Sequence, residues 1–133
     1  LHDPADMLPA VILGVAVTTW VAGFDIIYAC QDAGFDAAHG LHSVPARVGV
    51  AAALTRAKWL HVATLLLLAL LPPAVPALGP IYWTAVAIIA ALLAWEHALV
   101  RPDDLSRVNQ AFFTANAAIG LVLLAAIGID LWV

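Results

Sequence analysis

The sequence predicts an all-α fold, a bundle of transmembrane helices, from its composition, its apolar segments and the prolines between them. Hydrophobic residues fill 65% of the 133 positions, charged residues only 11%, and the mean hydropathy is +1.01. Soluble domains are roughly half apolar and about a quarter charged. Four segments approach or exceed the roughly 20 apolar residues that a helix needs to cross a bilayer. Residues 1–133 are therefore expected to form part of one membrane domain.

Short connections separate the four predicted spans. The spans cover about residues 8–30, 50–71, 81–100 and 111–133. The second contains four consecutive leucines at its apolar centre, and it needs its flank from Val50 onward to reach spanning length. Prolines at positions 72, 73, 76 and 80 predict a tight turn after it, because proline removes a helical donor. In the fourth span, Asp130 lies close enough to the end to reach an interface.

The basic residues predict which side of the membrane each connection faces. Arg47, Arg56 and Lys58 lie between the first span and the apolar centre of the second, and Arg101 and Arg107 lie between the third and fourth spans. Four antiparallel spans place these two connections on one side, and the other side has no Lys or Arg. By the positive-inside rule, the basic side faces the cytoplasm. We expect a bacterial-type inner membrane, with the end of the first span in the cytoplasm.

Three carboxylates end the first span, in the stretch "DIIYACQDAGFDAAHG" from Asp25 to Gly40. Asp25 and Asp32 are seven residues apart, and Asp32 and Asp36 are four apart, so a continuous helix would carry all three on one face. Tyr28 belongs to the same stripe. The glycines that follow predict a break beyond Asp32, which would splay Asp36 while keeping it near.

These acids need a partner. A carboxylate within a span is costly and usually faces protein, water or an ion, and two carboxylates four residues apart repel each other. Residues 25–36 contain no Lys or Arg. Hard oxygen ligands suit Mg²⁺, particularly an ion shared with a phosphate, which could then help a diphosphate to leave. A proton or cation pathway would use the same acids, so the residues alone leave both readings open.

The stretch resembles the second Asp-rich motif of the UbiA superfamily of intramembrane aromatic prenyltransferases. That motif reads D-x-x-Y-A-x-x-D-x-x-x-D-x-x-x-G-x-x-S, and every position is filled from Asp25 to Ser43. Residues 41–49 and 96–117 also resemble the branch that prenylates 4-hydroxybenzoate or a related naphthoate. The resemblance covers nearly the whole chain.

The resemblance implies a nine-helix bundle, of which the four spans here correspond to helices six to nine. Two Asp-rich motifs would each bind Mg²⁺ and together hold polyprenyl diphosphate, whose prenyl group is transferred to an aromatic acid in ubiquinone or menaquinone biosynthesis. Asp32 and Asp36 would be metal ligands, and Asp25 and Tyr28 would line the polar end of the cavity. Arg47 could contact the diphosphate, although loop cations ordinarily contact lipid headgroups.

The family's first motif, N-D-x-x-D-x-x-x-D, does not occur in the sequence, nor does its tyrosine and lysine motif. The first ten residues, "LHDPADMLPA", read as an extramembrane connector that leads into a span. The chain is therefore expected to be a C-terminal portion that lacks the N-terminal helices and is inactive alone. Two alternatives are a small four-helix protein that binds or conducts a cation without catalysis, and a noncatalytic remnant that packs with another membrane protein.

The remaining polar residues are expected to have structural or solvent-exposed roles. His39 and His42 have no third ligand nearby for Zn²⁺ and are expected to be polar loop residues. Asn109 and Asn116 are expected to share a face and to bond neighbouring helices. The pair Glu96 and His97, with two acids beyond it, is expected to be interfacial and solvated. No Gly-rich phosphate loop and no basic aromatic surface occurs, so we expect no nucleic-acid partner.

Overall fold

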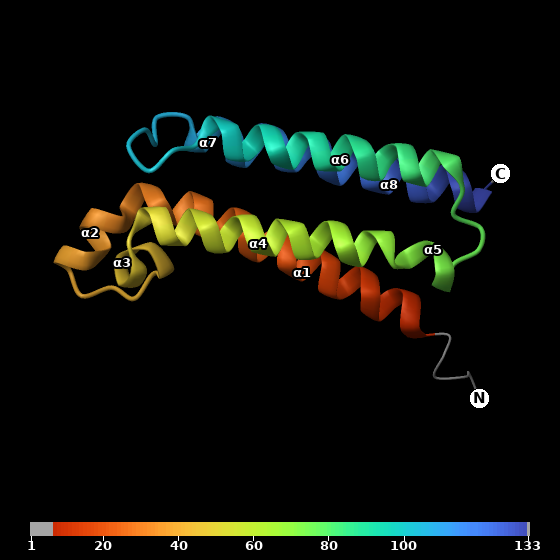
Figure 1. Ribbon diagram of the computed structural model, residues 1–133, viewed down its shortest axis with the longest axis horizontal. Helices are drawn as coiled ribbons and strands as arrows, with labels where there is room; N and C mark the ends of the chain where they lie inside the picture. Colours follow the sequence, from red (N-terminus) through yellow and green to blue (C-terminus); the bar gives the residue numbers. More distant parts are fainter. Residues whose placement is uncertain (1–6, 133) are drawn as a thin grey trace.

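Four long helices lie side by side in the computed structural model, which describes residues 7–132 (Figure 1). They are α1 (Leu8–Ala29), α4 (Val50–Ala69), α6 (Pro80–Leu99) and α8 (Asn116–Trp132). Within the described range there is no β-strand, and each of the four helical segments is long and apolar enough to cross a membrane. The predicted all-α transmembrane bundle is confirmed. Residues 1–6 of the expected connector and Val133 of the fourth predicted span lie outside the described residues.

Short helical elements join and extend the long ones: η2 (Cys30–Asp32), α2 (Ala33–Ala38), α3 (Val44–Val48), α5 (Leu71–Ala74), α7 (Val108–Gln110) and η3 (Ala111–Ala115). The 3₁₀ turn η2 connects α1 directly to α2, so the first span and the acidic stretch form one helical run. A break does follow Asp32, since α2 ends at Ala38 and residues 39–40 form a turn. It comes after Asp36, so it does not splay that side chain as predicted. Arg56 and Lys58, predicted in a connection, lie within α4 because that helix begins at Val50.

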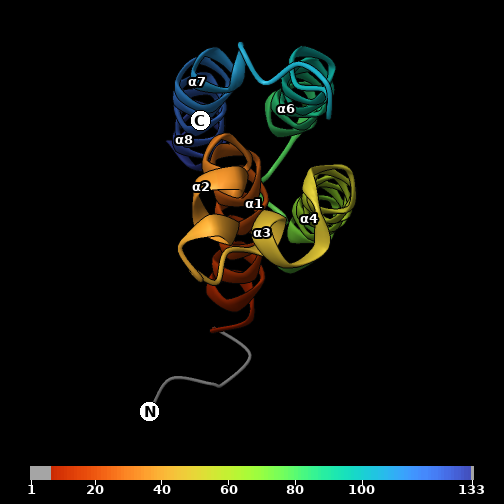
Figure 2. The ribbon, with the colours of Figure 1, turned by 90° about the vertical axis from the view of Figure 1, so that its left-hand side faces the viewer.

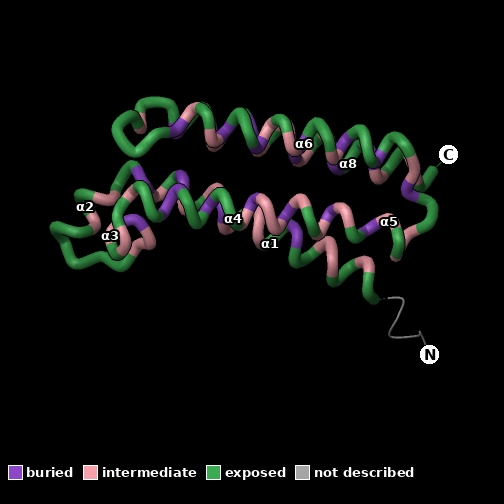
Figure 3. The backbone as a smooth tube through the Cα atoms, in the orientation of Figure 1, coloured by how far each residue is buried: buried purple, intermediate pink, exposed green. Residues whose placement is uncertain are grey.

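The helices form two pairs, α1 with α4 and α6 with α8 (Figures 1 and 2). Helices α2 and α3 and the loop before α7 gather at one end of the bundle, and α5 and the C-terminal end of α8 lie at the other. Buried residues follow the inward faces of the long helices (Figure 3). The acidic stretch and the loop between α6 and α7 thus share one end, as the antiparallel arrangement predicts.

Asp130 of α8 caps the N-terminus of α6. Its Oδ2 accepts hydrogen bonds from the backbone N–H groups of Gly79 and Tyr82, each at 2.9 Å. The first N–H groups of a helix have no partner within the helix, and a carboxylate there also interacts favourably with the helix dipole. Pro80 opens the helix and has no N–H to satisfy. The cap fixes the C-terminal end of α8 against the start of α6.

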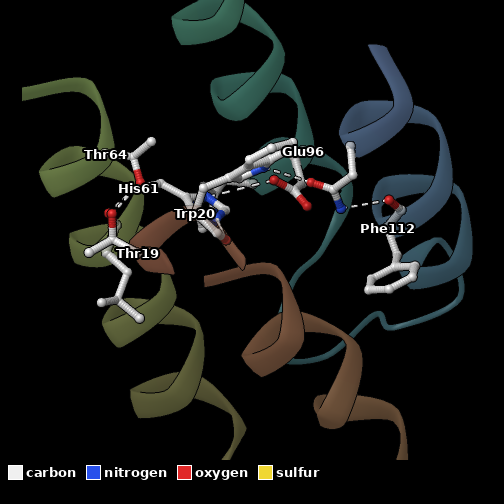
Figure 4. Close-up of polar contacts among 9 residues, drawn as sticks. Thr19, Trp20, His61, Thr64, Glu96 and Phe112 are labelled. Atoms are coloured by element: carbon white, nitrogen blue, oxygen red, sulfur yellow. Dashed lines mark hydrogen bonds and ion pairs between the residues drawn. The ribbon is translucent and has the colours of Figure 1, made fainter. Parts of the chain in front are cut away.

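Polar side chains on all four long helices meet at one level of the bundle, which we call the polar layer (Figure 4). Its members are Thr19, Trp20, His61, Thr64, Glu96, His97 and Asn116. The Trp20 indole donates to Asn116 Oδ1 at 2.8 Å, and the Trp20 carbonyl lies 3.3 Å from His61 Nε2. The hydroxyls of Thr19 and Thr64 are 2.9 Å apart. The polar layer therefore links α1 to α4 and to α8.

Gly23 lets the His61 ring lie directly against α1. A Cβ built at Gly23 would overlap the imidazole at Nε2 and Cδ2. His61 is itself buried, so the ring has little room to move. Only glycine at this position allows α4 to approach α1 with the imidazole between them.

We predict that Gly23→Ala destabilises the protein by about 1–3 kcal/mol, the usual cost of overpacking, because the methyl group displaces His61. Gly14→Ala is the matched control on the same helix, since a Cβ there meets no atom of the described chain within 4 Å. It should be neutral or stabilising by up to about 1 kcal/mol. Unfolding of both variants in mixed detergent micelles measures the difference, and equal stabilities would contradict the role of Gly23.

We also predict that Asp130→Ala lowers stability by about 0.5–2 kcal/mol, the range for loss of a helix cap. Asp130→Asn keeps an acceptor oxygen and should retain most of that stability. Hydrogen exchange of the Tyr82 amide should accelerate in the alanine variant. An unchanged exchange rate would show that the cap does not hold the start of α6.

Candidate functional site

The acidic stripe lies on the consecutive helical elements α1, η2 and α2. Asp25 and Tyr28 lie in the last turns of α1, Asp32 ends η2, and Asp36 lies in α2. The first three are exposed, and Asp36 is partly buried. A 3₁₀ residue rotates roughly 20° further than an α-helical one, so the short turn leaves Asp25 and Asp32 on the same side. The stripe predicted from spacing is retained, with its first three members exposed and Tyr28 in contact with Phe112.

The described residues do not form a complete metal site. Between residues 7 and 132, no three His, Cys, Asp or Glu side chains lie close enough together to hold a metal ion. Asp32 and Asp36 offer carboxylate oxygens one helical turn apart, from a surface with no cation between residues 25 and 36. Any ion on this pair would take its remaining oxygen ligands from water, from a phosphate or from other protein residues.

Aromatic packing fixes the Tyr28 ring. The ring centroid of Phe112 lies 4.5 Å from that of Tyr28 and 5.2 Å from that of Phe24, and Phe24 in turn packs edge-on against Trp20 at 5.8 Å. These rings form a ladder from the polar layer to the acidic stripe. Tyr28 is therefore held at its ring while its side chain stays partly exposed.

Phe112 belongs to the π-helical turn η3, an element that is rare and frequent at functional sites. Its carbonyl accepts a hydrogen bond from Asn116 Nδ2 at 2.6 Å, and Asn116 also accepts from Trp20. Asn116 thus makes the predicted interhelical bond. Asn109 is exposed, because the wider turn between the two residues changes the helical register. The neighbouring Phe113 is 63% exposed, so Phe112 and not Phe113 makes the contact with Tyr28.

Two further motif residues have backbone roles at this end of the bundle. Gly40 follows α2 with a φ of +68°, in the left-handed region that glycine adopts at little cost. The Ser43 hydroxyl accepts from the Ala46 N–H at 3.3 Å and caps α3. Helix α3 carries Arg47, which is exposed near α2. The helix that carries Arg47 therefore packs against α2, the helix that carries Asp36.

Within residues 7–132, neither loop histidine belongs to a group of three or more side chains that could hold a metal ion. His39 stacks on the Phe35 ring, with centroids 4.0 Å apart, and its Nδ1 lies 2.9 Å from the Phe35 carbonyl. His42 is exposed. Asp103 and Asp104 are also exposed, and hydrogen bonds from the Ser106 hydroxyl and N–H lower the pKa of Asp104.

The expectation that Glu96 and His97 are solvated is wrong. Glu96 has 0% of its surface exposed, and His97 is half-buried, with its Nε2 3.0 Å from His61 Nδ1. The register of α6 could have indicated this, since its buried positions recur every three or four residues: Tyr82, Ala85, Ile89, Leu93 and Glu96. Glu96 continues the apolar stripe that packs into the core.

Comparison with known proteins gives two matches. The model of the UbiA prenyltransferase family matches residues 5–127. The 4-hydroxybenzoate octaprenyltransferase of Chromohalobacter salexigens is 33% identical over 125 residues, which are 94% of this chain. The chain spans 41% of the length of that curated relative. No solved structure matches the chain.

Proposed function

The chain belongs to the UbiA prenyltransferase family, and from that premise we propose that its gene product transfers a polyprenyl group from polyprenyl diphosphate to an aromatic acid. The acceptor is 4-hydroxybenzoate or a related naphthoate, and the product enters ubiquinone or menaquinone biosynthesis. The observation that carries the proposal is the complete acidic motif on the helical run from α1 to α2. The name of the relative supports 4-hydroxybenzoate as the acceptor.

Asp32 and Asp36 would hold Mg²⁺ in this function. The donor set fits that ion, because both side chains are carboxylates, neither is fully buried, and residues 25–36 contain no competing cation. When bound, Mg²⁺ neutralises negative charge on a diphosphate and makes it a better leaving group. This motif would be one half of the diphosphate site.

Asp25, Tyr28 and Arg47 would orient the donor. Tyr28 is held by Phe112, so its hydroxyl can present a hydrogen bond from a fixed position. Arg47 on α3 would contact diphosphate oxygens, for which the guanidinium is suited. In the overall reaction the allylic carbon to oxygen bond of the donor breaks and a carbon to carbon bond forms on the ring. The ring loses a proton, and diphosphate leaves.

The remaining parts of the site would come from helices outside this segment. The curated relative is more than twice as long as the matched segment, and the described residues supply one Asp-rich motif. We propose that N-terminal helices of the same protein carry the opposing motif. We also propose that the basic end of the bundle faces the cytoplasm of a bacterial-type inner membrane, following the positive-inside rule.

Asp32→Ala and Asp36→Ala should each lower prenyl transfer by about 100-fold or more, the scale on which one preorganised electrostatic contact acts. Asp103→Ala, an exposed acid in the loop before α7, is the matched control and should retain activity. The assay uses membranes containing the whole gene product, polyprenyl diphosphate and 4-hydroxybenzoate. Unimpaired transfer by both stripe variants would refute their assigned role.

The 133-residue chain by itself should show no prenyl transfer, because the proposed diphosphate site needs two Asp-rich motifs and this chain supplies one. The whole gene product should lose activity when Mg²⁺ is chelated and recover it on readdition. Circular dichroism of the chain in detergent confirms that it is helical before the assay. Mg²⁺-dependent turnover by the folded chain alone would contradict the proposed division of the site.

A further inference from the structure

Glu96 is an acid within a membrane helix that lacks a hydrogen-bond partner. Its side chain has 0% exposure, and neither carboxylate oxygen is hydrogen-bonded within the described part of the chain. The nearest basic atom is Nδ1 of His61, 3.6 Å from Oε2. An uncompensated buried charge costs several kcal/mol, so the carboxyl must either carry a proton or face a protonated imidazole.

The geometry around His61 limits where protons can lie. His61 Nε2 is 3.3 Å from the Trp20 carbonyl, which can only accept, so this nitrogen carries a hydrogen. His61 Nδ1 lies between His97 Nε2 at 3.0 Å and Glu96 Oε2 at 3.6 Å. If Glu96 is ionised, a proton on Nδ1 balances its charge; if His61 is neutral, Glu96 holds that proton. Both states contain the same single exchangeable proton.

His97 connects this pair to the surface of the bundle. A groove of about 150 Å³ runs between α4 and α6, and both imidazoles line it together with Lys58. Its other walls are apolar side chains of the two helices. His97 is the most exposed of the three, whereas His61 and Glu96 are buried. His61 lies 3.0 Å from His97 and 3.6 Å from Glu96, so it joins the other two.

We propose that Glu96, His61 and His97 form an intramembrane proton-binding relay that opens to the groove between α4 and α6. The proton on Glu96 Oε2 passes to His61 Nδ1, which leaves a carboxylate facing an imidazolium. The imidazolium can then pass this proton to His97 Nε2 as His97 Nδ1 releases its own proton to the groove. The released proton carries the charge, and because the buried carboxylate is then unpaired, a proton returns from the groove by the reverse route. This inference goes beyond prenyl transfer and does not depend on it.

The other groups that face the relay do not compete for its proton. Helix α1 contributes Trp20 and α8 contributes Asn116, and neither side chain titrates. Lys58 is the remaining charged group that lines the groove, and its ammonium group opposes a positive charge on His97. Among the side chains named, only the three members of the relay can hold its proton.

The test is pH-difference infrared spectroscopy of the whole gene product in lipid nanodiscs. The wild type should show a protonated-carboxyl band that changes together with the imidazole bands. Glu96→Gln, which keeps the size and a donor, should lose that band, and Asp130→Asn should keep it. Identical difference spectra for the wild type and Glu96→Gln would overturn the proposal.

The path is tested separately by hydrogen exchange. In His97→Phe, exchange of the Glu96 carboxyl with deuterated buffer should slow by about 100-fold, the lower end of what a positioned proton carrier contributes. Circular dichroism and a retained Glu96 band show that this variant is folded. An unchanged exchange rate in the folded variant would exclude His97 as the connection to the groove.

Discussion

The arrangement of the bundle depends on the two hydrogen-bonding groups of Trp20. Its indole N–H reaches α8 through Asn116, and its carbonyl reaches α4 through His61. Within a bilayer no water is available to satisfy polar groups, so such contacts select one packing of otherwise uniformly apolar helices. Asp25 follows Trp20 by five residues, about 7–8 Å along the helix. The polar layer therefore fixes the position of α1 in the bundle. The acidic stripe begins near the end of that helix, so its position is fixed as well.

Exposure separates the two groups of acids in the chain. The stripe from Asp25 to Asp36 faces outward, where an ion, water or a further part of the protein can reach it. Glu96 is fully buried, with His61 as its nearest basic neighbour, and in the proposed relay it exchanges a proton through the two histidines. The ladder from Trp20 through Phe24 and Phe112 to Tyr28 joins the two regions. A diphosphate site and a proton site can thus coexist at different depths of one bundle.

The sequence predicts the four spans well because length and hydropathy are the physical requirements for crossing a bilayer. It predicts the acidic stripe because the 3₁₀ turn at residues 30–32 changes the helical phase only slightly. The π-helical turn escaped prediction, since no local signal at residues 111–115 distinguishes it from an α-helix. The exposure of Glu96 was predicted wrongly, because the prediction followed its charge and not its position on the buried face of α6. Its neighbour His61 also comes from a part of the sequence 35 residues away. The Asp130 cap likewise joins residues about 50 positions apart.

The central claim is that the stripe is one half of a Mg²⁺ and diphosphate site. The most direct measurement is the number of Mg²⁺ ions bound by the whole gene product with a polyprenyl diphosphate analogue that cannot ionise. Replacing both Asp32 and Asp36 with alanine should remove bound metal while the helical bundle remains folded. Unchanged stoichiometry and affinity in the doubly substituted protein would contradict the claim.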